Sequence, residues 1–345
     1  MSGLFTYHNF SLSETPPLTG KVAVITGGHA GIGREITAQL LLHDIAKVYI
    51  LGRKQENYSD AIKEWTTRKS IPEEECLKRT EFLTCDLSDL VAVKSTALDI
   101  VKKIRSDGGT ARLDMLFANA GVPTVPEYTL SPQGIETIFA ANHLGHFALI
   151  NILLPLLETT ASKYGNARII VTTSSFHMGC QELDLALLTS PTRTKSPANV
   201  DSCWRYARSK LANILFTRQL AKLLSKKSAE KVYANCFFPG NIPTGAMDTW
   251  KDLFGSIGGG LLKGMFQVVG QSTADGAATG IFLAASPEVE RAGLKGKYFI
   301  PIATEDQTSK LAENKDLAHN LWYWSDHQTT KALGKDWQDV AVEIE

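Results

Sequence analysis

The chain has 345 residues, 43% of them hydrophobic, and its 36 basic side chains equal its 36 acidic ones in number. A chain of this length can bury a full hydrophobic core, and its balanced charge argues against a basic nucleic-acid-binding surface as the main function. The five cysteines are scattered and form no Cys-x-x-Cys pair, so we expect neither a disulfide framework nor a metal site.

Residues 1–17 are expected to form an N-terminal extension. They have neither the basic flank nor the apolar run of a signal peptide. Elsewhere no stretch approaches the roughly 20 apolar residues that span a bilayer, and residues 257–270 are interrupted by glycines and a lysine. We therefore expect a chain without a membrane span that works in the cytoplasm.

Short apolar runs rich in β-branched residues alternate with segments of helical periodicity. The first run, Lys21–Thr26, stops at a glycine, as a strand buried on both faces of a parallel sheet does. Ser88 is expected to cap the helix that follows the third strand. The predicted strands are 21–26, 47–51, 81–85, 113–118, 167–173, 231–238 and 296–301, and the predicted helices are 31–43, 56–69, 88–105, 133–162 and 204–224.

This alternation predicts one α/β domain over residues 18–330, doubly wound around a parallel sheet of about seven strands. No linker rich in Pro, Gly or Ser divides the segment into two folding units, and no internal repeat is present. Residues 331–345 are expected to form a C-terminal tail.

A glycine-rich turn follows the first strand. Gly27, Gly31 and Gly33 have the spacing G-x-x-x-G-x-G where this strand passes into the first helix. The first glycine permits a sharp turn, and the others let the backbone approach a pyrophosphate held at the helix N-terminus. The turn predicts a Rossmann-fold dinucleotide site that includes Ile32. His29 is a candidate for a further contact or, equally, a solvent-facing residue of the turn.

The end of the second strand decides which dinucleotide binds. An NAD enzyme usually places an acidic residue here to hold the ribose 2′-hydroxyl, whereas this chain has Arg53 and Lys54. A guanidinium can bind a 2′-phosphate through two hydrogen bonds, so we expect Arg53 and Lys54 to bind NADP(H). The alternative is that the two side chains belong to a solvent-exposed loop that contacts no cofactor. After the third strand, Asp86 and Leu87 are candidates for contact with adenine, and a helix cap is the alternative role for Asp86.

Tyr206 and Lys210 are the candidate catalytic pair. At positions i and i+4 of a predicted helix they share one face. A free phenol has a pKa of about 10, and a nearby cation lowers that pKa toward the working range of an acid-base catalyst. Ser174, at the end of the fifth strand, can donate a hydrogen bond to a carbonyl oxygen that gains negative charge. Asn142 lies inside a helix, where it is not locally favoured, and is expected to hold a water beside Lys210.

These elements together resemble the short-chain dehydrogenase/reductase superfamily, from Leu18 to about Thr330. Within it the chain is most similar to the retinol dehydrogenase and WW-domain oxidoreductase branch. The superfamily motifs are Thr26–Gly33, Asn119-Ala120-Gly121, Asn142, Ser174-Ser175, Tyr206-x-x-x-Lys210 and Pro239-Gly240 with Thr244. The branch motifs are Asn142–Phe147, Arg208–Phe216, Gly276–Thr279 and Gly296–Phe299.

The resemblance implies a role for each matched position. Tyr206 would be the acid/base, Lys210 would lower its pKa and bond the nicotinamide ribose, and Asn142 would hold a relay water. A serine would polarise the carbonyl; counting from Arg168 as the branch does points to Ser174, with Ser175 as the alternative. Asn119, Ala120 and Gly121 would steady the sheet beside the adenosine, and Pro239, Gly240 and Thr244 would contact the cofactor. Ala118 departs from the family, which often has a second Asn there.

Residues 241–272 are expected to form a flap over the substrate. Large apolar side chains alternate there with glycines, which predicts a bulky hydrophobic ketone or aldehyde and closure on binding. The alternative is that these side chains pack the sheet edge or a partner subunit. The candidate substrate contacts are Ser175, His177, Met247 and Trp250.

The hypothesis for function is an NADP(H)-dependent carbonyl reductase or alcohol dehydrogenase. Resemblance to fungal pathway reductases makes a polyketide-type ketone of secondary metabolism the leading substrate, and a retinal-like, steroid-like or lipid aldehyde is the alternative. A non-catalytic NADP-binding regulator is the competing class of function. The family often pairs through the helices that carry Asn142 and Tyr206, so a homodimer is a further expectation.

Overall fold

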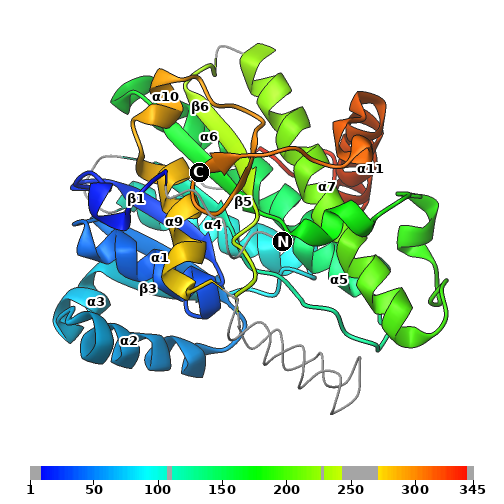
Figure 1. Cartoon of the computed structure of the whole chain (residues 1–345), viewed down its shortest axis with the longest axis horizontal. Coiled ribbons are helices and arrows are strands. Elements are labelled where there is room, and N and C mark those ends of the chain that lie inside the picture. The colour runs from blue at the N-terminus through cyan, green and yellow to red at the C-terminus, as the bar shows by residue number, and fades with distance from the viewer. Residues whose placement is uncertain (1–8, 107–110, 227–228, 243–270, 340–345) are drawn as a thin grey trace.

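The computed structural model describes residues 9–106, 111–226, 229–242 and 271–339. Within them an eight-stranded sheet of order β3-β2-β1-β4-β5-β6-β7-β8 lies between two layers of helices (Figure 1). Neighbouring strands pair in parallel from β3 to β7, and β8 pairs antiparallel with β7. The strands are β1 Val22–Thr26, β2 Lys47–Gly52, β3 Thr80–Thr84, β4 Met115–Ala118, β5 Ala167–Thr172, β6 Val232–Phe237, β7 Tyr298–Ile300 and β8 Thr304–Glu305. The predicted single-domain, doubly wound α/β fold is confirmed, and the very short β8 is the strand that the pattern did not indicate.

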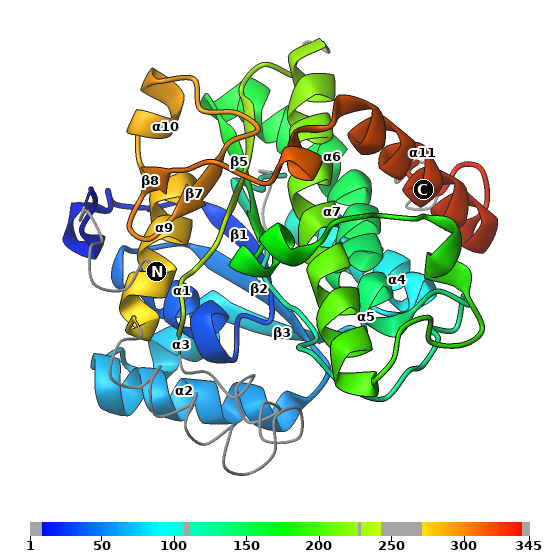
Figure 2. The same ribbon diagram turned by 45° about the vertical axis from the view of Figure 1, so that its right-hand side comes forward.

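Two hydrophobic cores lie on the two faces of the sheet. Successive residues of a strand point to opposite faces, so Ile169 and Val171 join one core and Ile170 joins the other. Helices α4, α6 and α7 cover the first face, with α11 packed outside them, and α1, α2 and α9 cover the second (Figure 2). The helices are α1 Gly31–Leu42, α2 Gln55–Lys69, α3 Glu73–Arg79, α4 Leu90–Ser106, α5 Thr137–Phe139, α6 Gly145–Tyr164, α7 Ala198–Lys226, α9 Thr273–Ala285, α10 Glu288–Arg291 and α11 Lys315–Leu333.

The helix after β3 begins later than expected. It starts at Leu90, where Oδ1 of Asp89 accepts a hydrogen bond from the Val91 N–H at 3.0 Å. The Ser88 hydroxyl instead donates to Oδ1 of Asp86 at 2.8 Å. The prediction that Ser88 caps this helix is therefore wrong, because the carboxylate of Asp89 takes that position.

The segment that carries Asn142 is not the single regular helix predicted over 133–162. It starts at Thr137, passes through a π-helical turn at Ala140–Leu144 and continues as α6. The stretch Thr137–Tyr164 is long and apolar enough to cross a membrane, but 94% of its apolar window is buried inside the structure. It therefore has the burial of a core helix packed against the sheet.

The C-terminal helix α11 packs across α6 and α7. The ring of Trp322 stacks on Phe216 of α7 with 5.7 Å between centroids, and it meets Phe147 of α6 edge-on at 5.1 Å. The hydroxyl of Ser325 lies 2.9 Å from Nε2 of the fully buried His143. The two helices through which we expected pairing thus have one face covered by α11 of the same chain.

Both predicted ends of the domain are packed against it. Phe10, from the expected N-terminal extension, is buried against Phe282 of α9 with 5.6 Å between ring centroids. Helix α11 runs through the expected boundary at residue 330, and Trp337 beyond it is buried beside Phe147 at 6.0 Å.

Candidate active site

A cleft of about 700 Å³ opens at the carboxyl ends of the parallel strands. This is the edge where ligands bind in open α/β sheets, because loops and helix N-termini converge there. Within the described residues, Gly33, Asn142 and His177 lie outside its lining, and Thr244, Met247 and Trp250 fall in the part of the chain that is not described. The predicted residues that line the cleft are Gly27, His29, Gly31, Ile32, Arg53, Lys54, Asp86, Leu87, Asn119, Ala120, Gly121, Ser174, Ser175, Tyr206, Lys210, Pro239 and Gly240.

The glycine turn has the tight geometry that its spacing predicts. Gly27 has φ +69° and Gly31 has φ +51°, both in the left-handed region that favours glycine. Gly33 lies beneath the turn, where a Cβ would stand 2.3 Å from the carbonyl oxygen of Gly27. The bare backbone therefore leaves a concave surface at the N-terminus of α1, as a bound pyrophosphate requires.

Asn119 and Ala120 join the ends of β1 and β4. The hydroxyl of Thr26 accepts the N–H groups of Asn119 and Ala120, both at 2.9 Å. The Asn119 side chain donates to the Thr26 carbonyl at 3.0 Å. These bonds hold the glycine turn against β4 beside the cleft, the steadying role that the resemblance implied.

Cationic and imidazole side chains gather at the end of β2. Arg53 and Lys54 are exposed on the cleft wall and make no ion pair with the residues that the structure describes. His29 is buried rather than solvent-facing, and burial lowers its pKa. Its Nδ1 has no hydrogen-bond partner in the described part of the chain. This group of nitrogen donors fits an anionic ligand.

Asp86 faces the cleft from the end of β3 and is exposed. Its Oδ1 accepts hydrogen bonds from the backbone N–H of Ser88 at 2.9 Å and from the Ser88 hydroxyl at 2.8 Å. These bonds make a local turn before α4, whose first turn is capped by Asp89, so the helix-cap alternative for Asp86 is wrong and its place on the cleft wall is compatible with the contact to adenine.

The phenol of Tyr206, the hydroxyl of Ser174 and the ammonium of Lys210 meet in the cleft. Burial raises the pKa of Tyr206 to about 12, and a hydrogen bond with the Ser174 side chain opposes this rise. Burial lowers the pKa of Lys210 to about 8. Nζ of Lys210 lies 5.5 Å from the centroid of the Tyr206 ring and donates to the Thr172 carbonyl at 3.3 Å. The expected lowering of the Tyr206 pKa by Lys210 is not seen, because burial of the phenol dominates.

The two serines that follow β5 occupy different environments. Ser174 is buried and bonds to Tyr206, whereas Ser175 is exposed on the cleft wall. His177 points away from the cleft and is fully buried. Its Nδ1 lies 2.7 Å from the Ser174 carbonyl oxygen, and its ring meets Tyr298 at 5.2 Å. The structure therefore corrects the expectation that His177 contacts substrate: it anchors the turn that presents Ser174.

Asn142 is fully buried beside the cleft and is bound to the protein itself. Its Oδ1 accepts from the Val122 N–H at 2.6 Å, and its Nδ2 donates to the Val122 carbonyl at 3.0 Å and to the Ser209 hydroxyl at 3.0 Å. The side chain that we expected to hold a water is thus engaged in fixing the segment after Gly121.

His146 connects Asn142 to the glycine turn. Its Nδ1 lies 3.0 Å from the Asn142 carbonyl oxygen, and its Nε2 lies 2.8 Å from the Thr26 hydroxyl. Since a carbonyl only accepts, Nδ1 carries the proton and Nε2 accepts from Thr26. Burial lowers the pKa of His146 to about 4, so the ring is neutral at physiological pH. His146 is thus a buried residue that links the Asn142 segment to the glycine turn.

Phe176 was not predicted as a site residue. It follows Ser174-Ser175 on the turn Ser175–Gly179, lines the cleft and meets the Tyr206 ring edge-on at 5.6 Å. It remains 37% exposed, which is unusual for a phenylalanine. Its position directly after the serine pair is the sequence signal that would have indicated it.

Comparison with known proteins agrees with this geometry. A family model described as short chain dehydrogenase matches residues 21–181. A short-chain dehydrogenase/reductase of Armillaria gallica is 33% identical over 92% of this chain and 93% of its own length. Retinol dehydrogenase 14 of Homo sapiens is 32% identical over 88% of this chain and 84% of its own length.

A solved structure of an uncharacterised protein from Mycobacterium paratuberculosis shares the fold with a TM-score of 0.68. It is 23% identical and covers 94% of this chain and 98% of its own length. The relatives match along nearly the whole chain, and the cleft holds the Tyr206, Lys210 and Ser174 side chains together. The chain belongs to the short-chain dehydrogenase/reductase family of nicotinamide-dependent oxidoreductases, in its retinol dehydrogenase-like branch.

Proposed function

We propose that the protein is an NADP(H)-dependent carbonyl reductase that interconverts a bulky hydrophobic ketone or aldehyde with its alcohol. The observation that carries this proposal is the meeting of Tyr206, Ser174 and Lys210 in one cleft beside the glycine turn. Such a cleft places a proton donor, a carbonyl-polarising hydroxyl and a cofactor site within reach of one substrate.

The proton chemistry follows from the pKa of each group. With its pKa raised to about 12, the Tyr206 phenol is protonated at neutral pH and donates its proton to the carbonyl oxygen of the substrate. The Ser174 hydroxyl donates a hydrogen bond to the same oxygen as negative charge develops on it. The nicotinamide, when bound, supplies the hydride that adds to the carbonyl carbon, or accepts it in the reverse direction.

Several residues fit the cofactor. Gly27 and Gly31 present bare backbone to the cleft, Gly33 packs closely beneath the Gly27 carbonyl, and the start of α1 provides N–H groups for the pyrophosphate. At the end of β2, Arg53, Lys54 and Nδ1 of His29, which has no partner among the residues described, suit a 2′-phosphate, and the sequence places no acidic residue at positions 52–55 to hold a ribose hydroxyl. These contacts favour NADP(H) over NAD(H).

Apolar side chains line part of the cleft. Val122, Pro123, Phe176 and Ile242 line it together with Tyr206. An exposed phenylalanine beside the catalytic phenol supplies a surface that a hydrophobic substrate covers. A polyketide-type ketone of secondary metabolism and a retinal-like or lipid aldehyde both belong to this class. The name of the human relative points to the second, and the apolar lining accommodates either.

A carbonyl-substrate screen tests the proposal. Purified protein is incubated with NADPH or NADH and a panel that spans polycyclic aromatic ketones, steroids, retinal and medium-chain aldehydes, with coenzyme oxidation as the readout. We expect turnover with NADPH and a bulky hydrophobic carbonyl, and loss of turnover in Tyr206→Phe with NADPH binding retained. NADPH binding without oxidation for every carbonyl and every alcohol in the panel would instead support a non-catalytic regulator.

A further inference from the structure

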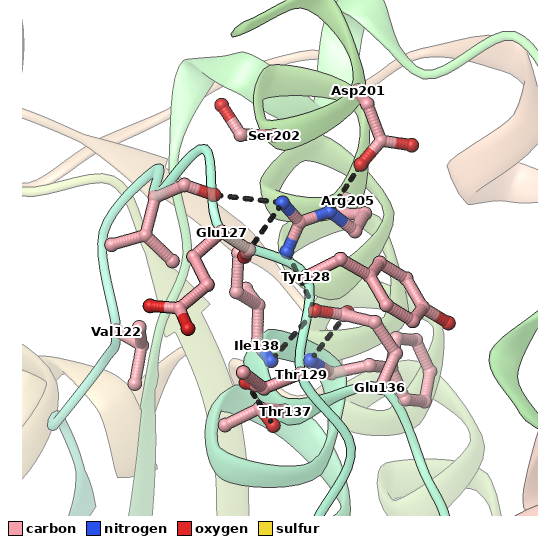
Figure 3. A network of polar contacts seen from close by, with 12 residues as sticks. Val122, Glu127, Tyr128, Thr129, Glu136, Thr137, Ile138, Asp201, Ser202 and Arg205 are labelled. Carbon is pink, nitrogen blue, oxygen red and sulfur yellow. Dashed lines mark hydrogen bonds and ion pairs between the residues drawn. The ribbon is translucent and has the colours of Figure 1, made fainter. Parts of the chain in front are cut away.

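Arg205, the residue before the catalytic tyrosine, is at the centre of a buried polar network (Figure 3). Its Nε donates to Asp201 at 2.7 Å and its Nη1 donates to Glu136 at 2.9 Å. All three side chains are 1% exposed or less. A guanidinium so placed is held in one orientation by two buried carboxylates on either side of it.

The remaining donors of Arg205 hold a loop that borders the cleft. Nη2 donates to the carbonyl of Val125 at 2.7 Å and to that of Glu127 at 3.2 Å (Figure 3). The loop begins at Val122, whose backbone N–H and carbonyl are both bonded by the Asn142 side chain. Arg205 and Asn142 thus fasten this stretch of backbone at two points.

The residues between these points form part of the substrate wall. Val122, Pro123 and Thr124 line the cleft together with Tyr206. The loop carries these residues, whereas α7 carries Tyr206 and Arg205, so the bonds of Arg205 join the wall to the helix of the proton donor. Arg205, the neighbour of Tyr206 in the chain, therefore fixes the distance between the Tyr206 phenol and the cleft wall formed by Val122–Thr124.

Glu136 connects Arg205 to the helical segment that carries Asn142. Its Oε1 accepts the Ile138 N–H at 2.9 Å and its Oε2 accepts the Phe139 N–H at 3.0 Å, so it caps α5. Helix α5 continues directly into the π-helical turn that holds Asn142. One buried carboxylate thereby connects the two anchors of the loop.

Stability alone does not explain this arrangement. Buried charges are expensive to desolvate, and well-packed apolar residues often stabilise a fold as well or better. What apolar residues cannot do is bond two carboxylates and two carbonyls in fixed directions, which needs the planar fork of an arginine. A lysine keeps the charge but not these directions.

We propose that Arg205 is a positioning residue of the reaction, which sets the loop Val122–Glu127 against the Tyr206 helix and so orients the bound carbonyl toward the phenol. This inference rests on the proposed carbonyl reduction. Because a reacting group displaced by about 1 Å can lose about 100-fold in rate, we expect Arg205→Lys to lower kcat by about 100-fold. The KM and the affinity for NADPH change much less, since the glycine turn and the end of β2 are untouched.

The matched control is Arg208→Lys. Arg208 lies on the same helix, is equally buried and approaches the same Glu136 at 3.9 Å, but it stacks on Trp204 and makes no hydrogen bond to this loop among the described residues. We expect Arg208→Lys to keep kcat within about threefold of wild type, as for changes outside the reacting geometry. Hydrogen exchange at residues 122–128 should be faster in Arg205→Lys and unchanged in Arg208→Lys.

Two outcomes overturn the inference while leaving the proposed function intact. In one, wild type turns over a carbonyl and Arg205→Lys binds NADPH with kcat unchanged. In the other, kcat falls equally in both arginine variants. If Arg205→Lys does not accumulate as folded protein, Asp201→Asn decides. It keeps Arg205 itself and replaces the carboxylate that accepts from Arg205 Nε and from the Lys195 N–H with a neutral amide that has one acceptor oxygen. A kcat lowered at constant NADPH affinity supports the inference, and an unchanged kcat overturns it. A wild type inactive throughout the screen overturns the proposed function instead.

Discussion

The ammonium of Lys210 approaches the ring of Tyr206 from the buried side of the cleft, with 5.5 Å between Nζ and the ring centroid. Lys210 is only 3% exposed, and its nitrogen also contacts the Thr172 carbonyl and the region of Gly121. Burial therefore acts on both members of the pair, raising the pKa of the phenol and lowering that of the lysine. The site combines a protonated phenol with an ammonium that is close to titrating.

The buried ammonium predicts an unusual pH dependence of stability. The folded-state pKa of Lys210 is about 8 and its ordinary value is 10.5, so the folded protein binds fewer protons than the unfolded chain between these values. The cost of burying the charge is fully present below pH 8 and is relieved as pH rises toward 10.5. We expect Lys210→Met to be more stable than wild type at pH 7 by about 3 kcal/mol, an advantage that shrinks at alkaline pH.

Urea unfolding at pH 7 and at alkaline pH measures this difference. The control is Lys63→Met on α2, whose side chain is 77% exposed, and its stability relative to wild type should not vary over the same range. A stability difference for Lys210→Met that is constant with pH would show that the lysine is not perturbed by burial.

Ser174, rather than Ser175, is expected to polarise the carbonyl, because it is the serine that bonds to Tyr206. Removing a preorganised donor to a developing oxyanion costs about 10²–10³ in kcat, and we expect this loss in Ser174→Ala. The variant also removes the hydrogen bond that opposes the rise of the Tyr206 pKa, so the alkaline rise of the alcohol-oxidation rate should move to higher pH. Ser175→Ala is the comparison, and a larger loss of kcat there would reverse the assignment of the two serines.

How far the sequence determines this site depends on how local each feature is. The glycine turn and the Tyr206–Lys210 spacing follow from neighbouring residues, and both were found where they were predicted. The contacts of His177 and Asn142 depend on Ser309 and Val122, which are distant in the sequence, so spacing indicated neither the buried position of His177 nor the bonds of Asn142 to Val122. The direction in which the pKa of Tyr206 shifts likewise depends on burial, which the spacing of Tyr206 and Lys210 does not reveal.

The same reasoning applies to the fold. Strands were predicted well because runs of buried β-branched residues have few alternatives in a parallel sheet. Helix α11 was missed because its aromatic residues pack on Phe216 and Phe147, far back in the chain, and its polar residues give a weak periodic pattern. Asn142 lies in a π-helical turn that interrupts the regular α-helical hydrogen bonds, and the helix propensities of the residues in this turn do not predict it.

Arg53 is expected to set the choice of cofactor. An arginine bonded to a phosphate contributes about 1.5–3 kcal/mol, so Arg53→Ala should weaken NADPH binding by roughly 10- to 100-fold and leave NADH binding nearly unchanged. Fluorescence titration of both coenzymes measures the ratio. Arg68→Ala on α2, with a side chain 75% exposed, makes the same change of net charge away from the cleft and controls for long-range electrostatics. An unaltered NADPH/NADH ratio in Arg53→Ala would contradict the phosphate contact.

Phe176 is expected to determine the preference for bulky substrates. Its ring stands edge-on to Tyr206 and remains 37% exposed at the cleft, so a hydrophobic substrate that binds there covers both rings. Full burial of a phenylalanine side chain contributes about 1.5–3 kcal/mol, and substrate can cover only the 37% of Phe176 that is still exposed. Phe176→Ala should therefore lower kcat/KM for a bulky carbonyl by roughly 3- to 7-fold. The effect should lie mainly in KM, since the contact is made equally in the ground and transition states.

A small carbonyl that does not reach Phe176 should be reduced by Phe176→Ala at nearly the wild-type rate, which makes the ratio of the two substrates the decisive measurement. Met178→Ala is the matched control: Met178 lies on the same turn and is 53% exposed, but it is not among the described residues that line the cleft. Equal losses for large and small carbonyls would mean that Phe176 supports the turn carrying Ser174 instead of contacting substrate. Because the Phe176 N–H already donates to the Ser174 hydroxyl at 3.2 Å through the backbone, that bond survives the substitution, and the side chain alone is tested.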